Sequence, residues 1–202
     1  GSGGKFGEGY SFDGLGDYLT IPGSSDWAVV GGYFTFETWF KAGDTQNTFP
    51  LFAPGNATTT NSAWVVDWHY VDTVGSEAYQ IRLKTYLGSS SSTIFTSEIT
   101  STSDYANDTW HHIAVVRSGS NFYSFVNGTQ YGTTTNYGSD LLYTTSDLLH
   151  IGGYSIDGTV ADATSSFYID DLRFTTGVAR YTSNFTVAAI ELGTGSNVGT
   201  KY

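Results

Sequence analysis

Two adjacent aspartates interrupt an otherwise apolar stretch, Phe167-Tyr-Ile-Asp-Asp-Leu-Arg-Phe174. In a regular β-strand, Asp170 and Asp171 would point to opposite faces, and one carboxylate would enter the core unpaired at a high free-energy cost. Ile169 and Leu172 also differ in parity, although both are apolar. A β-bulge adds one residue and gives them a common face. The pattern therefore predicts a bulge at 170–171, with both carboxylates at the outside or rim, free to bind a cation or an arginine.

Glycoside hydrolysis would require two carboxylates that flank the scissile bond. None of the five glutamates has a second acidic residue two positions away, the spacing that places two side chains on one face of a strand. The adjacent Asp170 and Asp171 would point apart in a regular strand. The acidic residues therefore favour a protein that is not an enzyme, with a glycoside hydrolase as an alternative.

Aromatic side chains offer a second chemistry, because a sugar ring presents a flat C–H face that stacks on a large rigid ring. Trp27 and Tyr154 lie in glycine-rich segments that read as loops, where binding residues are often placed. Trp64 and Trp68 share one face of a predicted strand, and His69 lies on the other, so only one of these sets can face outward. Burial in the core is the alternative for each set. The predicted ligand-binding residues are Trp27, Trp64, Trp68, His69, Tyr70 and Tyr154.

Two further tryptophans, Trp39 and Trp110, are predicted to lie in the core. The four histidines favour hydrogen-bonded strand positions over a transition-metal site. His111 and His112 point apart on one strand, and His69 and His150 are isolated in the sequence.

The charge balance excludes several partners. Among 202 residues there are 8 Lys and Arg against 19 Asp and Glu, a net charge of −11, which disfavours nucleic acids and anionic membrane surfaces.

The sequence contains no cysteine, so disulfides are excluded. No apolar run is long enough to span a bilayer, so we predict no membrane insertion, and no signal-peptide pattern precedes the first strand.

The elements that would position these side chains are strands. Apolar residues alternate with period two in nearly every apolar segment, and glycine, serine and asparagine clusters separate the segments, which predicts about ten to thirteen strands and no long helix. Asn127-Gly128 predicts a tight type I′ hairpin. Gly88–Thr93 and Thr133–Asp147 are predicted polar connections. On the strand at 33–40, the inward row is either Phe34, Phe36 and Thr38, or Tyr33, Thr35, Glu37 and Trp39. The predicted fold class is all-β, an antiparallel two-sheet jelly-roll sandwich.

Four blocks in order, SFDGLGDYLTIP, YFTFETWFK, TWHHIAVVRSGSNFYSFVNGTQYG and YIDDLRFTTGVARYTSNFT, resemble the laminin G-like (concanavalin A-like lectin/glucanase) domains found in phages, other viruses and secreted bacterial proteins. The blocks span Ser11 to Thr186. The resemblance implies a jelly roll with a carbohydrate-binding or adhesive role, often with a structural calcium ion. The calcium ligands that it implies are Asp13, Asp17, and Asp170 or Asp171; the alternative is a set of turn aspartates, or a pair formed with Arg173 or Arg180.

Residues 1–4 are predicted to be an expression scar, residues 5–190 one laminin G-like domain, and residues 191–202 a C-terminal tail. The expected function is a non-catalytic carbohydrate-binding or adhesion module, in a viral tail or virion or in a secreted protein. The expected partner is a glycan or cell-surface receptor, with a homo-oligomer as a possible assembly and an extracellular or virion location. The alternatives are a structural virion or adhesin module without glycan affinity, and a glucanase-like hydrolase.

Overall fold

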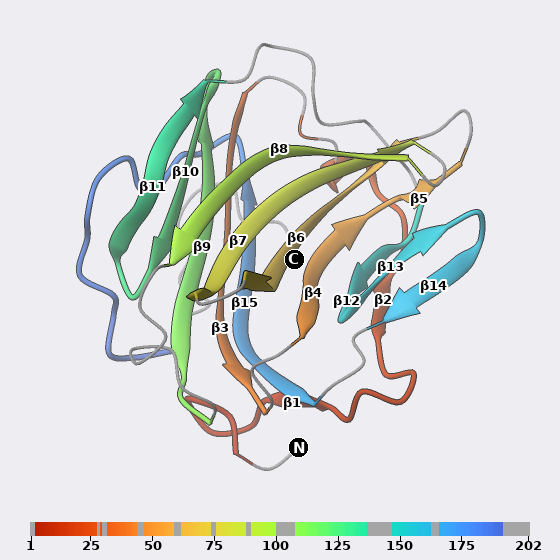
Figure 1. Ribbon diagram of the computed structural model, residues 1–202, viewed down its shortest axis with the longest axis horizontal. Helices are drawn as coiled ribbons and strands as arrows, with labels where there is room; N and C mark the ends of the chain where they lie inside the picture. The colour runs from red at the N-terminus through yellow and green to blue at the C-terminus, as the bar shows by residue number, and fades with distance from the viewer. Residues whose placement is uncertain are drawn as a thin grey trace.

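Two six-stranded antiparallel sheets dominate the computed structural model, which describes residues 3–27, 29, 32–43, 47–58, 62–73, 76–87, 90–99, 108–136, 147–162 and 166–191. The first sheet has the order β1 (Tyr10–Phe12), β15 (Phe167–Thr176), β3 (Tyr33–Ala42), β9 (His111–Ser118), β10 (Asn121–Val126) and β11 (Thr129–Asn136). The second has the order β2 (Leu19–Ile21), β12 (Leu149–Ile151), β4 (Thr48–Pro54), β6 (Ser62–Thr73), β7 (Ser76–Leu87) and β8 (Ser90–Ile99). In Figure 1, β6, β7 and β8 lie in front of β3, β9 and β15. The predicted two-sheet sandwich is confirmed.

The main core lies between these sheets and is rich in aromatic rings. On β3, the even-numbered residues Phe34, Phe36 and Phe40 face inward, which settles the choice between the two rows of this strand. Trp64 and Trp68 of β6 meet them from the second sheet, with Phe40 and Trp68 ring centroids 5.4 Å apart. Full burial of each such side chain stabilises the fold by roughly 1.5–3 kcal/mol, so this row accounts for much of the cohesion between the sheets.

Two predicted core tryptophans lie elsewhere. Trp39 is buried on the outer face of the first sheet, where the Phe6 ring packs edge-on at 5.7 Å and the Lys5 ammonium lies 4.4 Å from the indole centroid. Trp110 is half-buried beside Tyr168, outside the main core. The parity of β3 explains the first difference, because the inward position of Phe40 turns its neighbour Trp39 outward.

A third, small sheet was not predicted. It consists of β5 (Asn56–Ala57), β13 (Gly153–Ile156) and β14 (Thr159–Asp162), and its β5–β13 pair is parallel. The hairpin of β13 and β14 covers part of the outer face of the second sheet, where Tyr154 and Ile156 pack on Ala53, Val65 and their neighbours.

Of the predicted connections between strands, the hairpin at Asn127-Gly128 is confirmed, and the connection at Gly88–Thr93 is shorter than predicted. Asn127 and Gly128 both have positive φ (51° and 79°), as a type I′ turn requires, and Val126 pairs with Thr129 across the hairpin. The predicted connection at Gly88–Thr93 is wrong in extent, because β8 already begins at Ser90 and pairs with β7. The second predicted connection, Thr133–Asp147, begins too early, because β11 continues to Asn136 and pairs with β10. Its residues 137–146, and residues 192–202 of the predicted tail, lie outside the described residues. No helix in the described residues is long and apolar enough to cross a membrane.

The predicted bulge in β15 is confirmed. Asp170 pairs with Trp39 and Arg173 with Glu37, so three steps along β15 match two along β3. Ile169 therefore lies in the main core, and Leu172 packs against the same core. The residue that absorbs the extra length is Asp171, whose φ is 51°.

Substitution of Asp171 tests this backbone conformation. We expect Asp171→Val to be less stable to urea unfolding than Asp171→Gly by about 1–2 kcal/mol, because a side chain with a branched Cβ is strained in the left-handed region that glycine enters freely. Both variants lack the carboxylate, so their difference isolates the backbone. Equal stability would contradict a left-handed residue 171.

Candidate functional site

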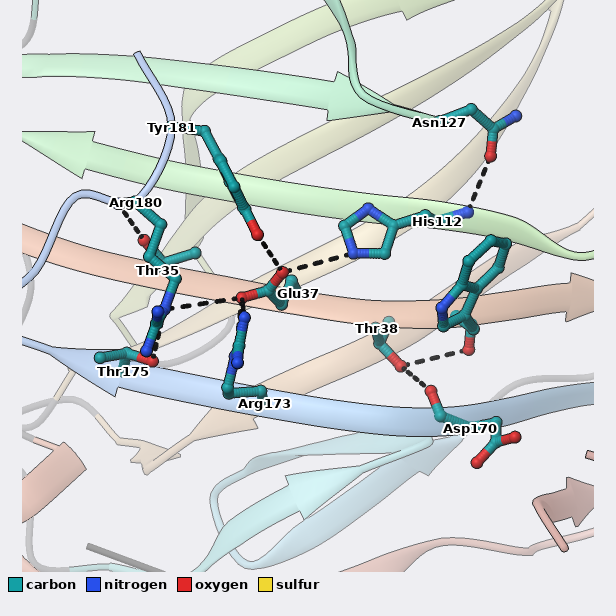
Figure 2. Close-up of polar contacts among 11 residues, drawn as sticks. Thr35, Glu37, Thr38, His112, Asn127, Asp170, Arg173, Thr175, Arg180 and Tyr181 are labelled. Atoms are coloured by element: carbon teal, nitrogen blue, oxygen red, sulfur yellow. Dashed lines mark hydrogen bonds and ion pairs between the residues drawn. The ribbon is translucent and has the colours of Figure 1, made fainter. Parts of the chain in front are cut away.

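Two features stand out: a buried ion cluster on the outer face of the first sheet and a pocket at the rim of the second. The ion cluster surrounds Glu37, which lies on the outward row of β3 (Figure 2). The segment Val178–Val187, here called the C-terminal strap, crosses this face and covers it. The carboxylate of Glu37 is 0% exposed.

Three segments satisfy the Glu37 carboxylate. Arg173 of β15 donates from Nε and Nη2 to Oε1 at 2.9 and 2.6 Å. Tyr181 of the strap donates its hydroxyl to Oε2 at 2.9 Å, and His112 Nε2 of β9 lies 3.3 Å from the same oxygen. Arg180 Nε approaches Oε1 at 3.8 Å. Both carboxylate oxygens therefore have partners in the protein itself.

Burial opposes ionisation of Glu37, yet hydrogen bonds from His112, Arg173 and Tyr181, with the positive charge of Arg173, outweigh it and lower the pKa of this carboxyl below its usual value. Burial and then the negative charge of Glu37 raise the pKa of Tyr181 to about 12. The phenol is therefore a hydrogen-bond donor at neutral pH, and the carboxylate is ionised.

Backbone and apolar contacts hold the strap in place. The Thr35 hydroxyl donates to the Val178 carbonyl at 3.0 Å. It also accepts from the Arg180 amide at 3.0 Å (Figure 2). Phe185 donates its amide to the Gly128 carbonyl at 2.9 Å, and its ring lies parallel to that of Tyr181. A Cβ on Gly128 would overlap the Phe185 carbonyl, which explains glycine at this hairpin position. The cluster has a structural role, because no surface of Glu37 is exposed for a ligand to contact.

The second feature is a pocket of about 300 Å³ at the edge of the second sheet, here called the rim pocket. One part of its lining, here called the floor, comes from β2 and β12 and the residues just before them, and the other part, here called the wall, comes from β5 and the β13–β14 hairpin. The wall is fixed by Asn56, whose side-chain oxygen accepts from the Ser155 hydroxyl at 2.8 Å and from the Gly158 amide at 3.0 Å. Its lining residues are Tyr18, Thr20, Asn56, Asp147, Leu148, His150, Ser155, Gly158 and Val160.

An aromatic ring and polar groups converge on the rim pocket. Tyr18 is 42% exposed, and its ring lies 6.0 Å from that of His150. His150 is only 3% exposed, and in the described structure its Nδ1 has no hydrogen-bond partner. Burial lowers the pKa of His150, against a hydrogen bond to the Ala53 carbonyl, so the imidazole is neutral at physiological pH. The pocket can therefore offer a ring face, a carboxylate, hydroxyls and a neutral imidazole.

The structure separates the predicted ligand-binding residues. Trp64 and Trp68 are fully buried in the main core and cannot present a ring face to a sugar. Tyr70 is half-buried against the same core. Trp27 lies in a 3-10 turn, Ser25–Trp27, half-buried against Phe174, and donates its indole N–H to the Pro22 carbonyl at 3.2 Å.

His69 and Tyr154 lie on the outer face of the second sheet. Tyr154 belongs to β13, where a loop was expected, and stacks on Tyr86 with centroids 5.1 Å apart. Beside them, Arg82 donates from Nε and Nη2 to Asp67 at 2.8 and 2.7 Å. Burial raises the pKa of the Asp67 carboxyl, and the hydrogen bonds and charge of Arg82 oppose the rise.

The surroundings of His69 lower the pKa of its imidazole. Burial first, and then the positive charges of Arg82 and Lys84, lower the pKa of His69 to about 4. Its Nδ1 lies 2.6 Å from the Thr48 hydroxyl. His69 and Tyr154 therefore share a face with the rim pocket without lining it.

The aspartates implied as calcium ligands are not gathered into one site. Both oxygens of Asp170 accept backbone N–H groups, from Phe6 at 2.8 Å and from Asp171 at 2.7 Å. Asp13 and Asp17 bond within their own turn, to the amides of Leu15 and Asp13. Among the described residues, no group of three or more His, Cys, Asp or Glu side chains could hold a metal. These four aspartates do not fit a shared ion, and structural calcium stays a prediction.

The rim pocket was missed because its parts are distant in the sequence. Tyr18 belongs to an expected strand, and Asn56 lies in a short strand that carries no periodic signal. His150 alternates with Leu149 and Ile151, both buried in the main core, so its outward position could have been read from parity. Nothing in the sequence indicates that Tyr18 and Asn56 meet beside it.

Glu37→Gln tests the ion cluster. We expect the free energy of unfolding to fall by about 3–5 kcal/mol, because the amide keeps the shape of the side chain but leaves Arg173 without its counter-charge. Urea unfolding at neutral pH measures the change. The exposed Glu8→Gln is the matched control, and an equally small effect of both variants would show that the cluster does not support the fold.

The acid sensitivity of the fold tests His69. The unfolded state binds a proton near pH 6.5, whereas folded His69 stays neutral down to about pH 4, so stability should fall as the pH drops through that window. We expect His69→Gln to have a shallower pH dependence of melting temperature between pH 6.5 and 4. His150 acts with the same sign. Glu37, with its lowered pKa, contributes to acid unfolding only below about pH 4.5. An unchanged slope in His69→Gln would contradict the shift.

Comparisons with known proteins agree with this architecture. The mouse laminin alpha1 chain, domains LG4-5, is 13% identical with a TM-score of 0.53 over 88% of this chain and 45% of that one. The receptor binding domain of botulinum neurotoxin D is 8% identical with a TM-score of 0.54 over 92% of this chain and 43% of that one. The chain thus spans less than half the length of these solved chains, and at such identities the likeness shows the fold alone. A comparison with curated protein sequences gives no match.

A family model matches most of the chain. The laminin G model described as the Concanavalin A-like lectin/glucanases superfamily covers residues 12–180. This range runs from β1, across both sheets, into the C-terminal strap, and it agrees with the resemblance of the four sequence blocks. The chain belongs to the concanavalin A-like lectin/glucanases superfamily.

Proposed function

We propose that the protein is a non-catalytic carbohydrate-binding module, which attaches a viral or secreted protein to a glycan or glycosylated receptor through the rim pocket. The observation that carries the proposal is the convergence of the exposed Tyr18 ring with the polar lining atoms of Asn56, Asp147 and Ser155. A sugar ring could lie with its C–H face on Tyr18 while its hydroxyls meet the polar atoms.

The second sheet supports this role better than the first. The outer face of the first sheet is covered by the C-terminal strap, and its buried carboxylate is fully bonded within the protein. The rim pocket is open, and its floor includes strands β2 and β12 of the second sheet. A floor that is already folded lowers the entropic cost of forming a binding site.

The non-catalytic assignment rests on the carboxylates. Glu37 is enclosed, and Asp67 is held by a bidentate contact to Arg82. The rim pocket has one carboxylate, Asp147, among its nine lining residues. Hydrolysis needs an acid and a second carboxylate about 5–10 Å apart across the scissile bond, a pair that the rim pocket does not provide from these residues.

Tyr18→Ala is the direct test. A glycan array first identifies the glycans that the wild type binds. We expect Tyr18→Ala to bind these glycans at least tenfold more weakly, because the sugar ring can no longer stack on the tyrosine ring. Tyr18→Phe should retain most of the affinity. The melting temperatures of all variants should be compared, so that unfolding is not mistaken for loss of binding.

Tyr33→Ala is the matched control, because Tyr33 is 49% exposed at the start of β3 and does not line the pocket. Equal binding by Tyr18→Ala and Tyr33→Ala would contradict the rim pocket as the site. Failure of the wild type to bind any glycan would favour the structural alternative, and release of reducing sugar from a bound glycan would favour the hydrolase.

A further inference from the structure

The lining of the rim pocket includes an acidic side chain but no basic one. Among its nine residues none is lysine or arginine, and one, Asp147, is an acid. The remaining polar groups are a phenol, hydroxyls, an amide and an imidazole, all of which suit the hydroxyls of a sugar. Nothing in this lining offers the charged fork with which proteins bind carboxylate or sulfate groups.

His150 does not supply the missing positive charge. Its ring is almost fully buried, and burial keeps the imidazole neutral at physiological pH. The titratable groups that face it across the pocket are the phenol of Tyr18 and the carboxylate of Asp147. Among the nine lining residues, Asp147 therefore supplies the one carboxylate, and no Lys or Arg accompanies it in the lining.

Three arginines of the described structure lie beside internal carboxylates, and the fourth, Arg117, donates from Nε to the Gly119 carbonyl at 2.9 Å. Arg82 is paired with Asp67, whereas Arg173 and Arg180 lie against Glu37. None of these three residues lines the rim pocket. The protein as a whole carries a net charge of −11, so its field also repels an approaching anion.

The size of the pocket limits the ligand further. Its volume of about 300 Å³ lies at the lower end of the range for ligand pockets, which suits one or two sugar rings rather than a long chain. A ring stacked on Tyr18 would bring its substituents close to Asp147. An anionic substituent there would lose water and gain no cation.

We propose that the rim pocket binds an uncharged sugar residue and excludes acidic sugars, namely uronic acids, sialic acids and sulfated sugars. This inference rests on the proposed carbohydrate-binding function and specifies its ligand class. The discrimination comes from Asp147 and from the absence of Lys and Arg in the lining, and not from the shape of the pocket alone.

Matched sugar pairs test the inference. A glycan array should carry oligosaccharides that end in glucose or galactose and the same oligosaccharides oxidised at C6 to the uronate, which differ in one CH2OH or COO⁻ group. Titration calorimetry of the best pair then gives both affinities. We expect the wild type at low salt to bind the neutral member at least tenfold more tightly. The ratio of the affinity for the neutral sugar to that for the uronate should fall at 0.5 M NaCl, because salt screens charge repulsion.

Asp147→Asn isolates the carboxylate, and Asp13→Asn is its matched control outside the pocket. We expect Asp147→Asn to narrow the ratio and Asp13→Asn to leave it unchanged. Equal or tighter binding of the uronate by the wild type would overturn the inference and leave carbohydrate binding intact. A ratio that changes neither with salt nor in Asp147→Asn would also overturn it, since shape would then be the cause. Absence of binding to both members would refute the proposed function itself.

Discussion

The buried charge of Glu37 is the constraint on which the first sheet depends. A carboxylate removed from water needs partners, and these come from β9, from β15 and from the C-terminal strap. The cluster therefore joins segments about 140 residues apart in the chain, and the bulge in β15 brings Arg173 opposite Glu37 in the ladder. Without the extra residue, the side chains beyond Asp170 would exchange faces.

The outer face of the first sheet is closed, which leaves the second sheet for the proposed glycan binding. The strap shields the outer face of the first sheet, whereas the outer face of the second sheet is covered only in part by the β13–β14 hairpin, beside which the rim pocket lies. The internal ion pairs also hold three of the arginines away from the rim pocket. Arg173 and Arg180 lie against Glu37, and Arg82 is paired with Asp67.

Features that depend on neighbours in the sequence could be predicted. The bulge followed from the mismatched parity of Ile169 and Leu172, and the hairpin from Asn127-Gly128, since both are local requirements of backbone geometry. Strand β6 shows where such reasoning ends. Both of its rows are buried, one between the sheets and the other on the outer face around Val65 and Asp67, so alternation could not tell which tryptophans were hidden. The rim pocket depends on contacts between distant segments, which parity does not encode.

The wall of the rim pocket belongs to neither large sheet. It is built by a ten-residue excursion, Gly153–Asp162, whose hairpin is fastened through Asn56 and a two-residue parallel pairing with β5. The aromatic core of the sandwich is made by other residues. Replacement of this short excursion would therefore change the lining of the rim pocket without removing a residue of the aromatic core. The proposed binding edge could thus vary between proteins that keep the same two-sheet fold.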